Sequence, residues 1–275
     1  MATVDMLGVA QIMREVAAEE ILPRWRNLAA GDVQTKSKSG DLVTVADRAA
    51  EVALARRLSD VLSGSRVVGE ESVADDPDVL QRFRERDPIW VVDPIDGTRN
   101  FTQGGTVFDV MVGLVVDGEP VAGWIYAPAE DVLYLGERGS GAQRRDASGT
   151  RAIAAPRGLP LSDLEGILGV NGFVSRGKPD PESVRHLLRG YVRPTCAGHN
   201  YGRILSGESQ FLINFSTHPW DHIPGLAIAS AAGFHAARHD GAPFDPLDRL
   251  GGILVAPGPE TWTAIHALLL EGTSA

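Results

Sequence analysis

The chain has 275 residues, enough to bury a large core as one big domain or as two fused halves. Its composition is that of an ordinary globular protein, and its formal net charge of −10 argues against non-specific binding to nucleic acid or to anionic membranes. A single cysteine, Cys196, excludes an intrachain disulfide and a cysteine-rich zinc site. We find no signal peptide and no apolar run of about 20 residues, so we expect a cytoplasmic protein.

The N-terminal part of the chain predicts two helices. Residues 5–30 place apolar side chains at helical spacing, and a polar loop containing Lys36 and Lys38 follows. The next segment predicts a helix that begins with Thr44 as N-cap and Asp47 in its first turn, a variant of the capping box. A carboxylate in that position can cap the helix and still face a site.

A short strand is predicted at residues 65–72, and it ends in Glu70 and Glu71. Two adjacent glutamates on a surface loop are usually solvated. This explanation is weaker at the end of a buried strand, where carboxylates can face a site. Residues 74–88 are charged and interrupted by proline, which indicates a loop or a short helix.

The centre of the protein is predicted at the end of the apolar run 89–92. We expect this buried strand to stop at Pro94, because proline cannot continue a central ladder. Asp93 and Asp96 flank the turn, and residues 96–98 have the composition of a helix start. Carboxylates suit hard divalent cations and helix-start N–H groups suit phosphate, so we expect a metal-assisted phosphate site here.

A β-sheet is predicted after the central motif. Residues 107–116 and 121–127 form a hairpin, and residues 131–136 add a third strand. The polar, glycine-rich segment 137–151 is the best candidate for a boundary between two halves. We therefore divide the chain into an N-terminal half, residues 1–145, and a C-terminal half, residues 146–275.

The second half predicts alternating strands and helices. The predicted strands are at 168–170, 190–194 and 210–215, and the predicted helices are at 181–189, 196–205, 226–232 and 261–270. Asp221 precedes one of these helices, where it could act as an N-cap or join the central carboxylates. Only folding can bring it to Asp96.

Three segments resemble, in order, the signature motifs of the inositol monophosphatase family of Mg²⁺-dependent, lithium-sensitive phosphatases. They are Gly69-Glu70-Glu71, the run from Asp93 to Thr98 with Asn100-Phe101, and Trp220-Asp221. Residues 43–47 and 123–142 are also similar to that family. The resemblance implies an α/β fold of layers α-β-α-β-α, with an α+β N-terminal half, an α/β C-terminal half and the site between them.

The resemblance also implies the metal ligands. Glu70, Asp93 and the backbone carbonyl of Ile95 would hold a first Mg²⁺ ion. Asp93, Asp96 and Asp221 would hold a second, with Glu70 near a weaker third.

The catalytic roles are carried over in the same way. Thr98, paired with Asp47, would orient the attacking water and help to deprotonate it, together with Glu70 and the metals. The N–H groups of Gly97 and Thr98 would hold the phosphate.

The sequence departs from the family pattern in the substrate half of the site. A thiol, Cys196, stands where a serine is usual, and Asn200 and Asn214 stand where acidic residues are usual. These departures make five residues the candidates for an altered substrate pocket: Cys196, Ala197, His199, Asn200 and Asn214. Alternatively, each of them only packs or caps.

We therefore expect a Mg²⁺-dependent phosphatase that hydrolyses a small polyol or sugar phosphate monoester, similar to inositol 1-phosphate, by in-line attack of water. The alternatives are histidinol phosphate, fructose 1,6-bisphosphate or 3′-phosphoadenosine 5′-phosphate as substrate, or a non-catalytic relative that binds a metabolite. Two or three Mg²⁺ ions per site and a homodimer are expected by analogy with the family, and no nucleic acid or membrane partner is expected.

Overall fold

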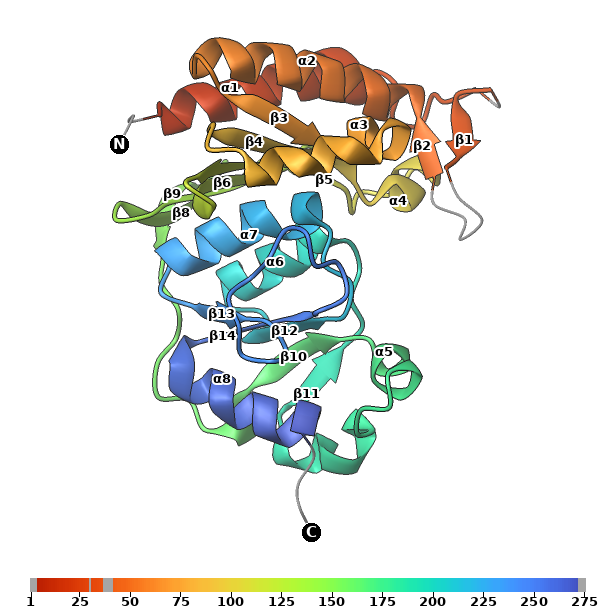
Figure 1. Cartoon of the computed structure of the whole chain (residues 1–275). Helices are drawn as coiled ribbons and strands as arrows, with labels where there is room; N and C mark the ends of the chain where they lie inside the picture. The colour runs from red at the N-terminus through yellow and green to blue at the C-terminus, as the bar shows by residue number, and fades with distance from the viewer. Residues whose placement is uncertain (1–3, 30, 37–41, 272–275) are drawn as a thin grey trace.

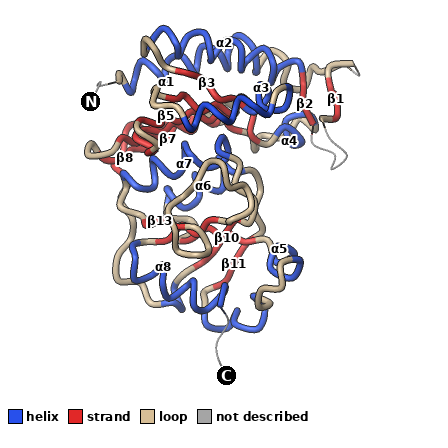
Figure 2. Tube along the Cα trace, viewed as in Figure 1, coloured by secondary structure: helices blue, strands red, loops and turns tan. Residues whose placement is uncertain are grey.

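The chain folds into layers that alternate between helix and sheet, and the predicted α-β-α-β-α arrangement is confirmed (Figure 1). The computed structural model describes residues 4–29, 31–36 and 42–271. Helices and strands separate into distinct layers along the long direction of the molecule (Figure 2). Within the described residues, no helix is long and apolar enough to span a membrane.

The outer helical layer consists of α1 (Met6–Val16), which continues as a π-helical turn (Ala17–Ile21), and α2 (Val45–Val61). These helices bury apolar side chains from one stripe against the first sheet, including Met13, Leu54 and Leu58. The predicted N-terminal helices are confirmed.

The first sheet has seven strands in sequence order, and every neighbouring pair is antiparallel except the first, which is parallel. The strands are β3 (Arg66–Gly69), β4 (Ile89–Asp96), β5 (Asp109–Val116), β6 (Glu119–Ala127), β7 (Val132–Glu137), β8 (Gly141–Asp146) and β9 (Gly149–Ile153).

Residues 137–151, the candidate boundary between the two halves, belong largely to the first sheet. Most of this segment forms β8 and β9, a hairpin that extends the first sheet. Strand β9 is an exposed edge strand and needs no apolar pattern. The glycines and arginines of this segment therefore belong to turns and to the solvated edge of the sheet. The proposed division after residue 145 falls inside β8.

The middle layer holds α6 (Ala197–Ser206) and α7 (Pro219–Ala231) between the two large sheets (Figure 1). Helix α7 lies directly on β6. A Cβ atom at Gly123 would stand 2.1 Å from the carbonyl oxygen of Pro224, so only glycine allows this approach. Pro224 lies inside α7, past its first turn, so its missing N–H removes one intrahelical hydrogen bond.

The second large sheet has the order β11-β10-β12-β14-β13 and mixes parallel and antiparallel pairs. Its strands are β10 (Glu165–Leu168), β11 (Gly190–Val192), β12 (Phe211–Asn214), β13 (His235–Ala237) and β14 (Ile253–Ala256). Helix α8 (Gly258–His266), followed by a π-helical turn (Ala267–Glu271), forms the last layer.

Smaller elements surround the end of β4. They are a short hairpin of β1 (Val33–Thr35) and β2 (Leu42–Thr44), and the short helices α3 (Glu70–Asp75) and α4 (Thr98–Thr102). Helix α5 (Val170–Ser175) and 3₁₀ turns at Pro77–Arg84, Leu161–Asp163 and Pro181–Leu187 complete the chain. Lys38 lies outside the described residues.

Candidate active site

The central motif lies at the carboxyl end of β4. The strand continues through Pro94 to Asp96, so the predicted stop at Pro94 is wrong. The pairing with β5 shifts in register between Asp93 and Asp96, which is a bulge-like irregularity. A proline is tolerated there because its missing N–H falls where the ladder is already interrupted.

The fold brings Asp221 to this point. Helix α7 begins at Pro219, with His218 as the N-cap, so Asp221 lies in the first turn and is not the cap. One carboxylate oxygen from each of Asp93, Asp96 and Asp221 lies within 4.8 Å of the others. These residues are far apart in sequence, and the middle-layer helix supplies the third.

The three carboxylates repel one another in a buried place. Asp93 is 1% exposed, and its Oδ1 has no hydrogen-bond partner among the described residues. Burial, followed by the neighbouring carboxylates, raises the pKa of Asp93 well above its usual value, and the same causes raise the pKa of Asp221. Buried carboxylates in such proximity need cations, and an all-oxygen ligand set suits a hard divalent ion.

Asp96 is held by the amino end of α6. The backbone N–H of Gly198 donates to Asp96 Oδ2 at 2.6 Å. Burial raises the pKa of Asp96 to about 6, although this hydrogen bond acts in the opposite direction. The contact joins the first sheet to the middle layer at the site itself.

Gly97 turns the chain from β4 into α4. It has a φ of 91°, and a Cβ atom there would lie 2.9 Å from the carbonyl oxygen of Val107. Glycine is therefore required by both conformation and space. The predicted helix start at residues 96–98 is close to the observed one at Thr98.

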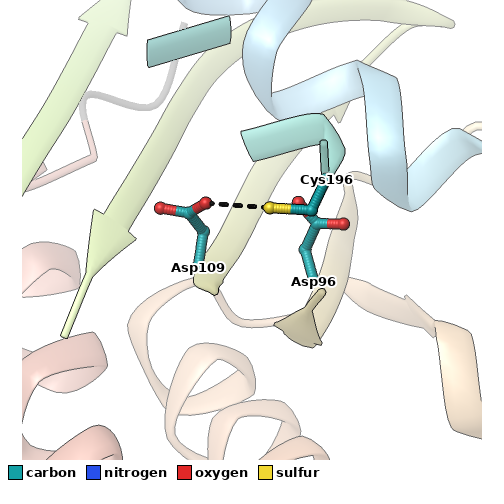
Figure 3. Close-up of side chains that lie close together, drawn as sticks. All are labelled: Asp96, Asp109 and Cys196. Atoms are coloured by element: carbon teal, nitrogen blue, oxygen red, sulfur yellow. Dashed lines mark hydrogen bonds between the residues drawn. The ribbon is translucent and has the colours of Figure 1, made fainter. Parts of the chain in front are cut away.

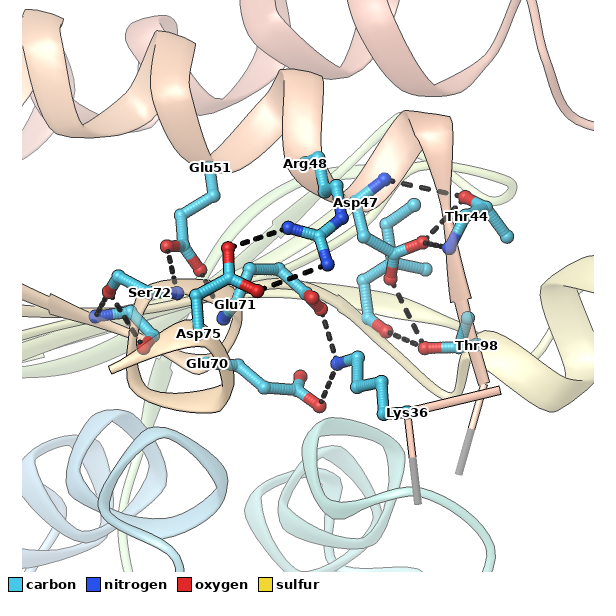
Figure 4. Close-up of polar contacts among 12 residues, drawn as sticks. Lys36, Thr44, Asp47, Arg48, Glu51, Glu70, Glu71, Ser72, Asp75 and Thr98 are labelled. Carbon is cyan, nitrogen blue, oxygen red and sulfur yellow. Dashed lines mark hydrogen bonds and ion pairs between the residues drawn. The ribbon is translucent and has the colours of Figure 1, made fainter. Parts of the chain in front are cut away.

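The side chains of Thr98 and Asp47 point toward each other (Figure 4). The Thr98 hydroxyl lies 3.2 Å from Asp47 Oδ1 and 3.0 Å from the carbonyl oxygen of Ile95. The predicted capping box is confirmed, because Asp47 Oδ2 accepts from the Thr44 N–H at 2.7 Å while Thr44 caps α2. Burial raises the pKa of Asp47 to about 6.

Glu70 and Glu71 begin α3, so they do not lie on a solvated loop. Lys36 Nζ donates to Glu70 Oε1 at 2.8 Å and forms a second ion pair with Glu71 (Figure 4). Glu71 is 3% exposed, and burial raises its pKa to about 8. The carboxylate of Glu51, from α2, accepts from the N–H groups of Glu71 and Ser72 and so caps the short helix.

Cys196 faces a buried carboxylate that the sequence analysis did not single out, Asp109 at the start of β5 (Figure 3). The thiol Sγ lies 3.5 Å from Asp109 Oδ2, and Asp96 lies on the other side. Burial, then the charges of Asp96 and Asp109, raises the pKa of Cys196 well above its usual value, so the thiol is protonated. A thiol in this state is a poor nucleophile.

A cavity of about 620 Å³ opens over the cluster. Its lining comes from both halves of the chain and consists of Lys36, Leu42, Glu70, Val73, Ala74, Pro77, Asp96, Gly97, Thr98, Arg99, Thr195, Cys196, His218, Trp220, Asp221 and Arg249.

Cys196 is the one residue of the predicted substrate group that lines this cavity. His199 faces a separate cavity of about 100 Å³, and Asn200 is buried and accepts from the N–H of Thr195 at 3.0 Å. Asn214 pairs with Ile253 inside the second sheet, and Ala197 is the first residue of α6. The side chain of Asn200 therefore has a structural contact that accounts for it, and neither asparagine lines the cavity over the carboxylate cluster.

Several lining residues escaped the sequence analysis as site residues, notably Lys36, Arg99, His218, Trp220 and Arg249. The rings of His218 and Trp220 stack with centroids 5.0 Å apart. Arg99 and Trp220 stand inside the recognised motifs, so proximity to those motifs could have indicated them. Nothing in the sequence near Arg249 indicates its place.

The fold and the carboxylate site together define the class of protein. The family model described as "Inositol monophosphatase family" matches residues 5–273, and the chain belongs to that family. It is a phosphoric monoester hydrolase of a metal-dependent family, and its acidic cluster could bind a metal ion.

Individual relatives agree with this assignment. Inositol monophosphatase 1 of Rattus norvegicus is 30% identical over 259 residues, which cover 89% of this chain and 87% of the rat protein. A fructose-1,6-bisphosphatase/inositol-1-monophosphatase of Aquifex aeolicus is 27% identical over 256 residues, covering 90% of each. The solved structure of inositol monophosphatase II from Staphylococcus aureus has a TM-score of 0.77 at 26% identity, covering 96% of this chain and 93% of that one.

Proposed function

We propose that this protein is a Mg²⁺-dependent phosphatase that hydrolyses a small polyol or sugar phosphate monoester by in-line attack of water. The observation that carries the proposal is the approach of Asp93, Asp96 and Asp221 to within 4.8 Å of one another. Such a cluster is costly to hold together without cations, and two of its members, Asp96 and Asp221, line a cavity large enough for a small ester.

The residues fit a hard divalent cation. Asp93 would help to hold the cations, because its buried Oδ1 has no hydrogen-bond partner among the described residues. Glu70 and the Ile95 carbonyl oxygen would hold one cation with Asp93, and Asp96 and Asp221 would hold a second. Bound Mg²⁺ would supply Lewis-acid chemistry, lowering the pKa of water and neutralising charge on the phosphate and on the leaving oxygen.

The chain's own groups then position the reactants. Thr98 can accept the proton of the attacking water while its hydroxyl proton is directed to Asp47, 3.2 Å away. The N–H groups of Gly97 and Thr98, at the start of α4, bind the phosphate oxygens in the proposal. Phosphate binding there keeps the scissile bond facing the carboxylate cluster.

A panel of phosphate esters tests the proposal. Purified protein with Mg²⁺ is expected to release phosphate from inositol 1-phosphate or a related sugar phosphate, and lithium is expected to inhibit. The panel includes histidinol phosphate, fructose 1,6-bisphosphate and 3′-phosphoadenosine 5′-phosphate, because the same carboxylate cluster could hydrolyse each of them. Metabolite binding without phosphate release across the panel would instead identify a non-catalytic relative.

The homodimer remains a prediction. Light scattering of the purified protein is expected to give twice the mass of 29.3 kDa. A monomeric mass would contradict it without affecting the proposed chemistry.

A further inference from the structure

The cavity over the carboxylate cluster is unusually rich in cations. Lys36, Arg99 and Arg249 line it together with the three carboxylates Glu70, Asp96 and Asp221. The chain as a whole has 36 acidic and only 26 basic residues, so this even balance departs from its composition. If metal ions neutralise the carboxylates, the cations give the mouth of the site a positive field.

Arg249 belongs to the long loop between β13 and β14, and this loop is fixed to the segment that leads into α7 (Figure 1). The N–H of Thr217 donates to the Arg249 carbonyl oxygen at 3.1 Å, and the Thr217 hydroxyl donates to the Asp248 carbonyl oxygen at 2.9 Å. Thr217 lies just before the helical turn that carries Asp221. The backbone of Arg249 is therefore held in a defined place beside the metal-ligand cluster.

The neighbouring acid does not neutralise Arg249. Asp248 Oδ1 accepts from the N–H groups of Leu250 and Gly251, each at 3.0 Å. Asp248 Oδ2 forms an ion pair with Arg238 at 2.9 Å. Arg249 itself is exposed, and its side chain takes part in no ion pair with any other described residue, so its guanidinium group is available to a ligand.

We propose that Arg249 is a specificity-determining residue that binds a second phosphate of the substrate. This inference rests on the proposed function, which assigns the scissile phosphate to Gly97, Thr98 and the carboxylate cluster. A guanidinium group matches phosphate with two parallel hydrogen bonds. The cavity of about 620 Å³ has room for a sugar that carries two phosphates, and the fixed loop lowers the entropic cost of binding the second one.

Two substrates that differ by one phosphate test the inference: fructose 1-phosphate and fructose 1,6-bisphosphate, both with Mg²⁺. For the wild type we expect a kcat/KM about 10- to 100-fold higher for the bisphosphate, the range of one charge-assisted contact. Arg249→Gln is expected to remove most of this preference through a higher KM, with kcat nearly unchanged. Arg249→Lys, which keeps the charge but not the planar fork, is expected to fall in between.

The control is Arg84→Gln, because Arg84 is another exposed arginine outside the cavity and without an ion pair to any described residue. It is expected to leave both kcat/KM values unchanged. Equal losses for both substrates in Arg249→Gln would overturn the inference and indicate general electrostatic steering. A wild type that hydrolyses the monophosphate but shows no preference would overturn it while the proposed function stands, whereas failure to hydrolyse any ester would overturn both.

Discussion

At the scale of single residues, the site is a balance between repulsion and cation binding. Asp93 is almost fully buried, and Asp96 and Asp221 bring their charges within 4.8 Å of it. Without cations, burial and this repulsion favour the protonated acids. A substitution that removes one charge therefore has opposite effects on activity and on the stability of the metal-free protein.

The variant Asp93→Asn tests these opposite effects on activity and stability. We expect kcat with Mg²⁺ to fall at least 100-fold, because an amide would be a poor replacement for a carboxylate proposed to hold two cations, a loss of about 2.7 kcal/mol or more. In EDTA we expect the free energy of unfolding to rise by about 1 to 2 kcal/mol, since a buried, repelling charge is gone.

Asp60→Asn is the matched control, because Asp60 is an exposed carboxylate at the end of α2. Neither quantity is expected to change in it. Retention of more than about a tenth of wild-type activity in Asp93→Asn would contradict the ligand assignment, since it corresponds to less than about 1.4 kcal/mol.

At the scale of elements, helix α7 carries Asp221 and also lies between the two large sheets. Its approach to the first sheet depends on small residues in the strands. At Gly113 and Gly136, as at Gly123, an added Cβ would come within 3.0 Å of α7 atoms. Close packing of the helix on the sheet therefore fixes the position of a site residue.

Gly123→Ala tests this coupling. The new methyl group would lie 2.1 Å from the Pro224 carbonyl oxygen, so the helix must move. We expect a loss of about 3 kcal/mol in unfolding free energy and a weaker Mg²⁺ affinity by calorimetry. Gly31→Ala, with no atom within 4 Å of its Cβ, is the control and is expected to change stability by less than about 0.5 kcal/mol. If Gly123→Ala lowers the unfolding free energy but leaves the Mg²⁺ affinity unchanged, the packing of α7 on the sheet does not determine the metal site.

His222 connects α7 to α6 and predicts a pH effect. Its ring lies 3.0 Å from the Tyr201 hydroxyl through Nδ1 and 3.0 Å from the Ser216 carbonyl oxygen through Nε2, which fits a neutral imidazole. Burial lowers its pKa from 6.5 to about 4. Between these values the unfolded chain binds a proton that the folded protein does not, so acidification removes stability.

The comparison with His222→Gln isolates this effect from the other titrating groups. The advantage of the wild type in unfolding free energy is expected to shrink by up to about 3 kcal/mol as the pH falls from 7 to 4. Denaturant unfolding at several pH values measures it. An advantage that stays constant with pH would show that His222 titrates normally.

At the scale of the whole molecule, the proposed metal ligands come from two parts of the chain. Asp93 and Asp96 belong to the first sheet, whereas Asp221 comes from the middle layer, after the chain has formed β10, β11 and β12 of the second sheet. An ion that binds all three stabilises their arrangement, and only the folded state offers it.

Mg²⁺ is therefore expected to raise the melting temperature. At 100 times the dissociation constant the gain is about 2.7 kcal/mol, or about 5 °C for a chain of this size. Asp221→Asn is expected to lose most of the increase, and Asp60→Asn to retain it. Scanning calorimetry with and without EDTA measures the shift, and an equal increase in Asp221→Asn would show that the metal binds without the middle layer.

Features that depend on local chemistry could be predicted from the residues alone. The capping box of Thr44 and Asp47, the hairpin of β5 and β6 and the motif around Asp93 follow from residues that are close in the chain. The layered fold followed from the resemblance carried by three motifs. The capping box and the hairpin depend on interactions between residues close in the chain, and the fold is indicated by the three motifs.

The remaining features come from the tertiary structure. It brought Asp221 to Asp93, placed Asp109 against Cys196 and put Arg249 at the mouth of the cavity. It also shows that Asn200 and Asn214 lie outside the cavity lining and that a glycine-rich segment forms β8 and β9. These placements depend on how helices pack on sheets and where loops are anchored, and such long-range contacts leave no periodic or local signal in the sequence.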